Sequence, residues 1–265
     1  MTEYLGTGDP TRSLSLLWGR LTPSTRGPAA GSTPGEIAAA AIRLGDEGGL
    51  DAVSMRKVAE RLGRSTMSLY TYVRSKAELL ELMLDTVLGE LPLEYDRSDG
   101  WRAAAETCAR EVWSFYERHP WVLQIADTRA TLGPNETASY ESQLRIFDDL
   151  GLSGLDMTRL VGVLGSFVRG SASSVANARA AEHATGISDD DWWRARTSVL
   201  DDVVGEDYAT RFPTVTKLQA QEQTFDEPWD GEIVGSYMET VARDTFEFGL
   251  ARLLDGIEAF LDARS

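Results

Sequence analysis

The strongest constraint on the fold is a series of closely spaced helix start and stop signals early in the chain. The stretch from Thr33 to Glu36 combines a capping box with a proline at the first helical position, and it predicts a helix over about residues 34–47. Ser54 is placed to cap a second helix. That helix is expected to end at Gly63, because a glycine after the C-cap readily takes the left-handed conformation that closes a helix.

A third helix is expected directly afterwards, around Ser65 to Tyr72, and a second capping box at Ser75 to Glu78 begins a fourth. Two short helices joined through a glycine, with one helix before them and one after, are typical of a helix-turn-helix inside a small helical domain. The spacing therefore predicts such a domain over residues 33–91.

The rest of the chain predicts helices and no strand, because no run alternates polar and apolar residues for long enough. The fold class expected is all-α, with a flexible Gly-, Pro-, Ser- and Thr-rich arm at residues 1–32 and a second, larger helical domain at residues 92–265. The acidic stretch 221–232 is expected to be a surface loop. The helices expected in the second domain cover residues 101–117, 120–131, 136–150, 155–182, 189–203 and 241–263.

The charge distribution separates one short segment from the rest of the chain. The sequence has 26 basic and 42 acidic residues, a formal net charge of −16, which disfavours a general affinity for nucleic acid. Between Asp51 and Lys76, however, six basic residues stand against two acidic ones, and the stretch 64–76, RSTMSLYTYVRSK, has no acid. Cations, hydroxyl donors and a helix N-terminus on one side are what phosphate contacts need. Helix capping explains any single serine or threonine here equally well, but the whole arrangement favours a local nucleic-acid-binding patch.

Composition limits the other classes of function. Cys108 is the single cysteine, and the two histidines, His119 and His183, lie far apart in sequence. No residue spacing typical of a metal site or a nucleophile–base pair occurs. We therefore expect no enzyme, no cofactor and no metal, although a carboxylate pair assembled only in the fold stays open as an alternative. No stretch approaches the roughly 20 apolar residues of a membrane span. A single cysteine fits a reducing compartment, so a cytoplasmic protein without membrane contact is expected.

The segment VSMRKVAERLGRSTMSLYTYVRSKAELLELMLD resembles the DNA-binding domain of the TetR family of bacterial transcriptional regulators, over roughly residues 33–91. The C-terminal FEFGLARLLDGIEAFL, residues 246–261, also resembles the ligand-binding domain of the tetracycline repressor branch. The resemblance implies a homodimeric regulator whose C-terminal domain binds ligand and forms the dimer. It also implies a repressor that a small-molecule inducer releases from a palindromic double-stranded DNA operator.

In that family the third helix lies in the major groove, and the resemblance implies the roles of single residues. Leu69 and Val73 would point inward and fix the helix. Arg26 in the arm would either reach the minor groove or, as we favour, belong to a disordered tail. The residues expected to face DNA or hold phosphates are Arg56, Ser65, Thr66, Met67, Ser68, Tyr70, Thr71, Tyr72 and Lys76.

The resemblance further implies a four-helix bundle made by the long helix and the last helix of two chains. The apolar stripe from Phe246 to Leu261 supports it, although a monomer could bury such a stripe internally. Arg169, in an apolar and glycine-rich helix, needs an acidic partner, an anionic ligand or solvent. A pocket needs apolar walls and a few polar groups. The candidates are Trp113, Phe115, Gln143, Phe147, Phe167, Arg169, Ser173 and Asn177.

The sequence departs from the tetracycline repressors in its histidines. Neither His119 nor His183 falls where that pattern places the histidine that reads a metal-chelated drug, and His119 is expected at a helix terminus beside Pro120. We therefore expect a different ligand. The remaining alternative is a helical small-molecule-binding protein or adaptor without specific DNA binding, which the net charge permits and the basic segment disfavours.

Overall fold

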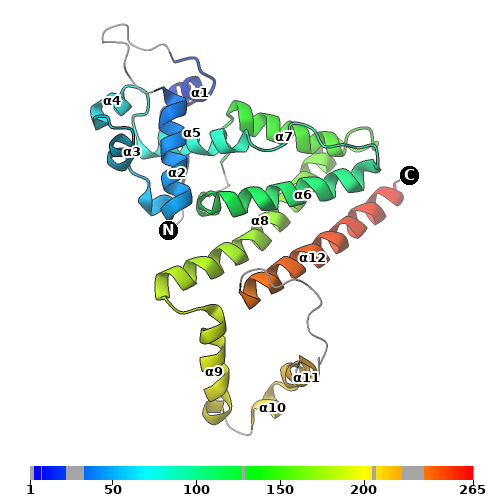
Figure 1. Cartoon of the computed structure of the whole chain (residues 1–265). Coiled ribbons are helices and arrows are strands. Elements are labelled where there is room, and N and C mark those ends of the chain that lie inside the picture. Colours follow the sequence, from blue (N-terminus) through cyan, green and yellow to red (C-terminus); the bar gives the residue numbers. More distant parts are fainter. Residues whose placement is uncertain are drawn as a thin grey trace. The chain divides into compact units, whose positions relative to one another are not determined.

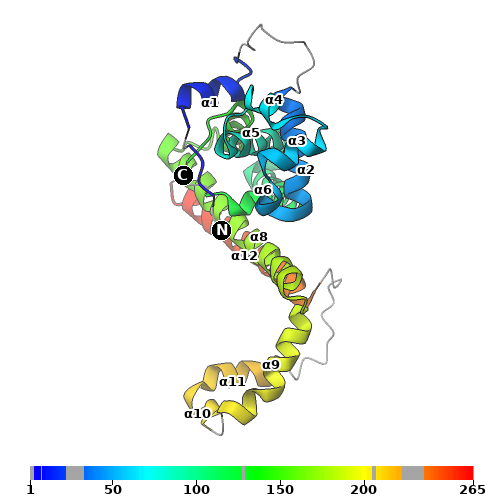
Figure 2. The same ribbon diagram turned by 90° about the vertical axis from the view of Figure 1, so that its left-hand side faces the viewer.

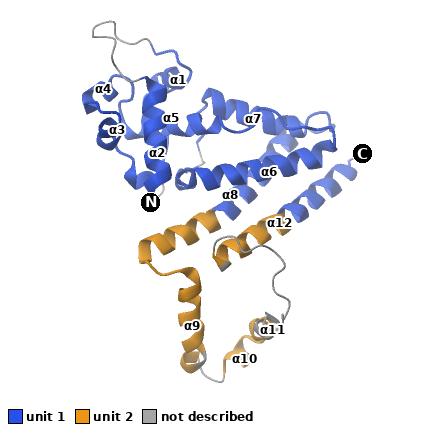
Figure 3. Ribbon diagram, in the orientation of Figure 1, with its two compact units in different colours: residues 1–172, 250–265 blue, residues 173–249 orange. Residues whose placement is uncertain are grey.

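The computed structural model of the chain describes residues 3–6, 8–21, 33–126, 129–204, 207–222 and 236–264. The all-α class is confirmed. Among the described residues, the β-type pairing is one isolated backbone bridge between Glu3 and Ile125. The chain divides into two compact units, residues 1–172 with 250–265 and residues 173–249 (Figure 3). In the described part of the chain, no helix is long and apolar enough to cross a membrane.

Four helices of the first unit form the predicted helix-turn-helix region: α2 (Pro34–Ala52), α3 (Met55–Arg61), α4 (Thr66–Tyr70) and α5 (Lys76–Leu88). In Figures 1 and 2, α3 and α4 lie side by side next to α2. The capping box at Thr33 is confirmed, with both of its reciprocal hydrogen bonds to Glu36 present. The double glycine breaks α2 as expected, because Gly49 takes a φ of 67° that ends the regular helix there.

The junctions around α4 follow the sequence signals closely. Ser54 caps α3, and Gly63 lies in the left-handed region with a φ of 63° between α3 and α4. Ser75 caps α5 by accepting a hydrogen bond from the Glu78 amide at 3.1 Å. The second capping box forms only in part, since the Glu78 carboxylate accepts from the amide of Arg74 at 2.8 Å.

One hydrophobic core holds this region together. It joins buried residues of α2, α3, α4 and α5, among them Ile37, Val58, Leu69 and Leu79, and it continues into Trp121 of the short helix η1 (Pro120–Gln124). Because α4 has only five residues, burial of Leu69 on this core, rather than helix propensity, keeps it helical.

The N-terminal residues differ from the flexible arm that their composition predicted. Helix α1 (Pro10–Leu17) is capped by Asp9 and packs on the same core through Leu16 and Leu17, and Leu5 is buried there as well. Residues 22–32 of the expected arm, with Arg26, lie outside the described residues. The turn-forming residues of this segment favoured a flexible arm, whereas its apolar residues Leu5, Leu16 and Leu17 fix its structure by packing on the core.

The middle of the first unit contains α6 (Gly100–Arg118), η1 and α7 (Pro134–Ile146). The prediction of a helix over 120–131 was wrong for the described residues beyond Gln124: of that range, the described part forms the short helix η1 and then leaves helical conformation. The backbone is extended at Ile125, and the carbonyls of Leu123 and Ile125 accept from a side chain of α8 instead of from the next turn of a helix. A tertiary contact therefore overrides the local helical pattern.

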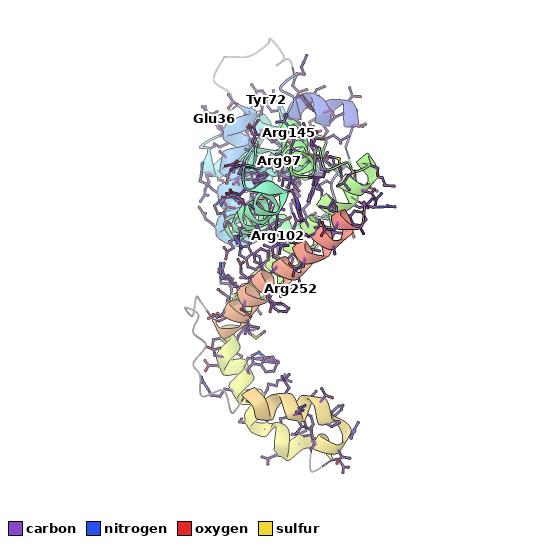
Figure 4. The ribbon with its side chains drawn as sticks, turned by 90° about the vertical axis from the view of Figure 1, so that its right-hand side faces the viewer. Glu36, Tyr72, Arg97, Arg102, Arg145 and Arg252 are labelled. Atoms are coloured by element: carbon purple, nitrogen blue, oxygen red, sulfur yellow. The ribbon has the colours of Figure 1, made fainter. Side chains whose placement is uncertain are left out.

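Two long helices run through both units, α8 (Gly154–Thr185) and α12 (Tyr237–Asp262). In the first unit, Arg102 of α6 forms ion pairs with Asp255 and Glu258 of α12, at 2.7 and 3.0 Å (Figure 4). The pairing with Asp255 raises the pKa of Arg102 and, together with Arg252, lowers the pKa of Asp255.

The second unit adds three helices: α9 (Asp189–Val204), α10 (Tyr208–Arg211) and α11 (Pro213–Glu222). Helix α9 was predicted, whereas α10 and α11 were missed because Phe212-Pro213 was read as a break. A proline can equally occupy the first position of a helix, as it does in α11. Of the loop expected at 221–232, the first two residues belong to α11 and the rest lie outside the described residues.

Candidate nucleic-acid interface

Helix α4 has one buried face and one exposed face. Leu69 and the following Val73 have no exposed surface, which confirms the prediction that both point inward. On the opposite face Met67 is 74% exposed and Tyr70 is 41% exposed. Ser65 and Thr71 are exposed as well, and Thr66 and Ser68 are half-buried. The helix therefore presents a row of short hydroxyl and apolar side chains to its surroundings.

The hydroxyl groups of Ser65 and Ser68 at the start of this helix differ in their hydrogen bonds. Ser65 occupies the N-cap position without a side-chain capping hydrogen bond, and the Ser68 hydroxyl donates to the Ser65 carbonyl at 2.6 Å. The cap therefore lacks the side-chain acceptor that Ser54 and Ser75 supply at α3 and α5. An acceptor on a docked ligand, such as a phosphate oxygen, can take this place.

The cations around α4 fall into two groups. Arg56 pairs with Glu60 at 2.9 Å, Arg61 with Glu47 at 2.6 Å, and Lys76 with Glu3 at 2.8 Å. The Arg61 contact lowers the pKa of Glu47, so that carboxylate stays ionised. The remaining basic residues of the patch are exposed and form no ion pair with a described residue: Lys57, Arg64 and Arg74. Sequence reasoning counted them in the charge patch but gave them no contact.

Two of the predicted DNA-facing residues have a different environment from the one expected. Tyr72 is half-buried and packs against the hydrophobic core, so its ring is only partly available. Lys76 is half-buried, and its amine is held by the Glu3 carboxylate of the N-terminal segment. Both residues therefore also help to fix the domain.

A buried histidine connects this domain to the following helices. His119, at the C-cap of α6 as predicted, has Nδ1 2.8 Å from Asp46 of α2 and Nε2 3.1 Å from Glu90. Asp46 also accepts from the Trp121 indole N–H at 2.7 Å. Both ring nitrogens of His119 thus lie beside carboxylates, and the Trp121 indole holds one of these carboxylates in place, so the histidine has a structural role. In the described residues no group of three His, Cys, Asp or Glu side chains is placed to hold a metal ion.

Arg169 of α8 was expected to meet an acid, an anionic ligand or solvent, and it meets backbone carbonyls. Its guanidinium donates to Ile125 at 2.6 Å, to Leu123 at 3.1 Å and to Val122 at 3.4 Å. Its guanidinium carbon also lies 5.9 Å from the centre of the Tyr116 ring. The arginine thus fixes the end of η1, and η1 packs on α2 through the core residues Trp121 and Val122.

The other predicted ligand-binding residues are distributed over both units. Phe115 is completely buried in the core around α2 and α5, which explains it without a ligand. In the first unit, Trp113 and Phe147 are buried, while Gln143 and Phe167 are half-buried, and the Gln143 amide donates to Ser139 at 3.2 Å. Ser173 and Asn177 belong to the second unit, where Asn177 is exposed. Among the candidates in the first unit, Gln143, Phe147, Phe167 and Trp113 remain predictions for a pocket wall.

The first unit also carries an outward face of small and apolar residues. On α8, Leu155 and Val163 are exposed, and a Cβ added at Gly162 or Gly170 would meet no atom within 4 Å. These positions recur at helical spacing on one face. On α12, Gly256 and Phe260 are exposed in the same way, whereas Leu250, Leu254 and Ile257 are buried within the chain. The predicted apolar stripe is therefore divided between an inner and an outer face.

Comparison with known proteins finds similar proteins over almost the whole chain. Residues 37–83 match the family described as bacterial regulatory proteins, tetR family, and residues 91–261 match the tetracyclin repressor-like C-terminal domain. The HTH-type transcriptional repressor DrrR1 of Streptomyces coeruleorubidus is 38% identical over 264 residues, which cover 99% of this chain and 91% of that protein.

Solved structures resemble the chain in fold. Apo ActR of Streptomyces coelicolor has a TM-score of 0.66 and 24% identity, covering 92% of this chain and 100% of the ActR chain. ActR in complex with actinorhodin has a TM-score of 0.63 and 25% identity, covering 87% of this chain and 97% of that chain.

Proposed function

Because the chain belongs to the TetR family of bacterial regulatory proteins, we propose that it is a repressor that binds a palindromic DNA operator and leaves it when a small-molecule inducer binds. The observation that supports this most strongly is α4 itself. Met67 is the most exposed large side chain of this helix, and Leu69 and the following Val73 anchor the helix in the core. Basic residues lie around this exposed face, although the chain as a whole is acidic. Such a helix can enter the major groove while the cations contact phosphates.

The acidity of the rest of the chain limits where DNA can bind. With a net charge of −16, most of the surface repels DNA. The exposed cations beside α4, Lys57, Arg64 and Arg74, would attract the phosphates of DNA to this helix. Phosphate contacts would position the protein, and Thr66, Met67 and Thr71 would read base edges. It would act in the cytoplasm, where a bacterial operator lies.

The proposed ligand site lies in the C-terminal domain. ActR, which shares the fold, has been solved with actinorhodin bound. We propose that this chain also takes an organic small molecule, with Gln143, Phe167 and Trp113 among the wall residues. Arg169 is removed from the proposed ligand contacts, because its guanidinium is engaged by three carbonyls at the end of η1.

The proposed assembly is a homodimer. Its support in this chain is the outer face of α8 and α12, where exposed Val163 and Phe260 accompany glycines with open space around them. Close helix packing between two copies needs small residues of this kind next to apolar ones. A dimer also gives two copies of α4, as a palindromic operator requires.

Coupling between ligand and operator needs contacts that join the sensing helices to the DNA-binding helices. Three are present in the first unit: Arg169 to the end of η1, His119 to Asp46, and Asp85 of α5 to the start of α7. Asp85 accepts from the amides of Asn135 and Glu136, each at 3.0 Å. A ligand that moves α7 would therefore act on α5 through Asp85, and one that moves α8 would act on α2 through η1.

The test is selection of bound sequences from random duplex DNA with the full chain, followed by a mobility shift with the selected site. The proposal expects an inverted repeat, bound far more tightly than competitor DNA and strongly weakened by salt. Thr71→Ala with Met67→Ala should abolish this specific complex while dimer mass and melting temperature stay unchanged. Val163→Glu should give a monomer and lose the complex. Binding without sequence preference would support the alternative of a helical ligand-binding or adaptor protein.

A further inference from the structure

The N-terminal segment, residues 3–6 and 8–21, packs into the DNA-binding domain although it precedes the region matched to the family, residues 37–83. Leu5, Leu16 and Leu17 are buried in the same core as Leu69 of α4. The segment therefore has a packed position next to the proposed reading helix.

Arg12 of α1 contacts the turn that joins α4 to α5. Its guanidinium donates to the carbonyl of Tyr72 at 2.8 Å and lies 3.5 Å from the Glu78 carboxylate (Figure 4 shows Tyr72). The other oxygen of Glu78 accepts from the Arg74 amide at 2.8 Å. The side chains of Arg12 and Glu78 are only 15% and 6% exposed. The pair thus holds the backbone on both sides of Val73.

Further contacts keep the N-terminal segment in place. Glu81, buried on α5, accepts from the Gly6 amide at 2.8 Å and from the Ser13 hydroxyl. The indole of Trp18 donates to the Leu132 carbonyl at 3.0 Å. Glu3 pairs its backbone with residues 124–126, at 3.0 and 2.9 Å, and its carboxylate binds Lys76. The segment that contains Arg12 is therefore held in place by packing and hydrogen bonds.

We propose that Arg12 is a positioning residue for operator recognition: it fixes the Tyr72 carbonyl and thereby the C-terminal end of α4. The proposal rests on the DNA-binding function proposed above. Helix α4 has five residues, and a helix of this length does not hold its own geometry. Base-reading side chains must be held closely in place to discriminate sequences, whereas phosphate attraction tolerates movement. Loss of Arg12 should therefore reduce specific binding and spare non-specific binding.

The experiment compares Arg12→Met with Arg20→Met in the full chain, using the operator selected from random DNA and an unrelated duplex. Arg20 is exposed on the same segment, so its replacement changes the charge equally and controls for it. We expect Arg12→Met to raise the operator Kd at least tenfold and to change the Kd for unrelated DNA less than twofold. The dependence of log Kd on log salt should keep its slope. Arg20→Met should leave both Kd values within twofold.

A second variant separates positioning from folding. Arg12→Met leaves the buried Glu78 carboxylate without its cation, so Arg12→Met with Glu78→Gln removes that charge while the amide oxygen still accepts from Arg74. The double variant should melt near the wild-type temperature and keep the loss of operator affinity.

Wild-type operator affinity in the double variant would overturn the proposal, as would its failure to fold, which would assign Arg12 to stability alone. Equal loss on both DNAs with a shallower salt slope would also overturn it, since that result marks a direct phosphate contact. A wild-type chain that shows no operator preference would instead contradict the proposed function.

Discussion

Replacing Arg169 with methionine tests how the sensing helices hold the DNA-binding domain. The substitution keeps an unbranched side chain and removes the guanidinium that donates to Ile125 and Leu123 at 2.6 and 3.1 Å. A hydrogen bond from a charged donor contributes about 1.5–3 kcal/mol. Because Arg169 is half-buried and water can partly replace it, the lower value is appropriate, which gives a total of about 3 kcal/mol for the two bonds. For a chain of this size that is a loss of about 6–12 °C in melting temperature.

The assay is thermal unfolding followed by circular dichroism at one fixed protein concentration, because a dimer melts at a temperature that depends on concentration. Arg159→Met is the matched control: Arg159 is on the same helix, its side chain is 66% exposed, and among the described residues its ion pair is with Asp156, at 3.4 Å. The control should change the melting temperature by less than about 4 °C, since exposed pairs contribute about 0–1 kcal/mol. A shift below 1 °C for Arg169→Met, combined with loss of the response to ligand, would refute the structural role and return Arg169 to the pocket.

Three further predictions concern single positions. Gly133→Ala should destabilise the chain by about 1–3 kcal/mol in urea unfolding, because the added methyl group would overlap the Asp85 carboxylate, whereas Gly35→Ala, which has open space, should not. Burial raises the pKa of Asp85, so its contribution to stability is present at low pH and is lost as pH rises through the folded-state pKa. Asp85→Asn should therefore raise the melting temperature at pH 7 and have little effect at pH 4; an equal effect at both pH values would contradict this. Met67→Ala should leave stability within about 0.5 kcal/mol and lower operator affinity by about tenfold, as expected for loss of one base contact.

The local signals of the helix-turn-helix could be predicted because each depends on a few neighbouring residues. The Thr33 capping box, the Ser54 cap and the left-handed Gly63 are all present at the expected positions. The inward direction of Leu69 and Val73 followed from the helical period once α4 was placed.

The features that the sequence did not predict depend on contacts between distant residues. Arg169 reaches carbonyls more than forty positions away, and this contact also explains why the helix expected over 120–131 ends at Gln124. The burial of α1 depends on Glu78 and Glu81 of α5, which satisfy Arg12 and Gly6. A sequence signal existed: Glu78, Glu81 and Asp85 recur at i, i+3 and i+7, an acidic face that a buried helix must pair. No local sequence pattern, however, indicates which residues pair with these three carboxylates.

The central claim, that α4 of each subunit enters a major groove of a palindromic operator, can be tested with a single labelled position. Met67→Cys places a thiol on the exposed face of α4, and the native Cys108 does not compete because burial raises its pKa to about 11. An iron chelate attached at position 67 cleaves DNA within reach of its hydroxyl radicals. With α4 of each subunit in a major groove, we expect two cleaved patches, one in each half-site, symmetric about the operator centre and facing the major groove. Cleavage at a single patch, cleavage spread evenly along the duplex, or no cleavage of a bound operator would contradict it.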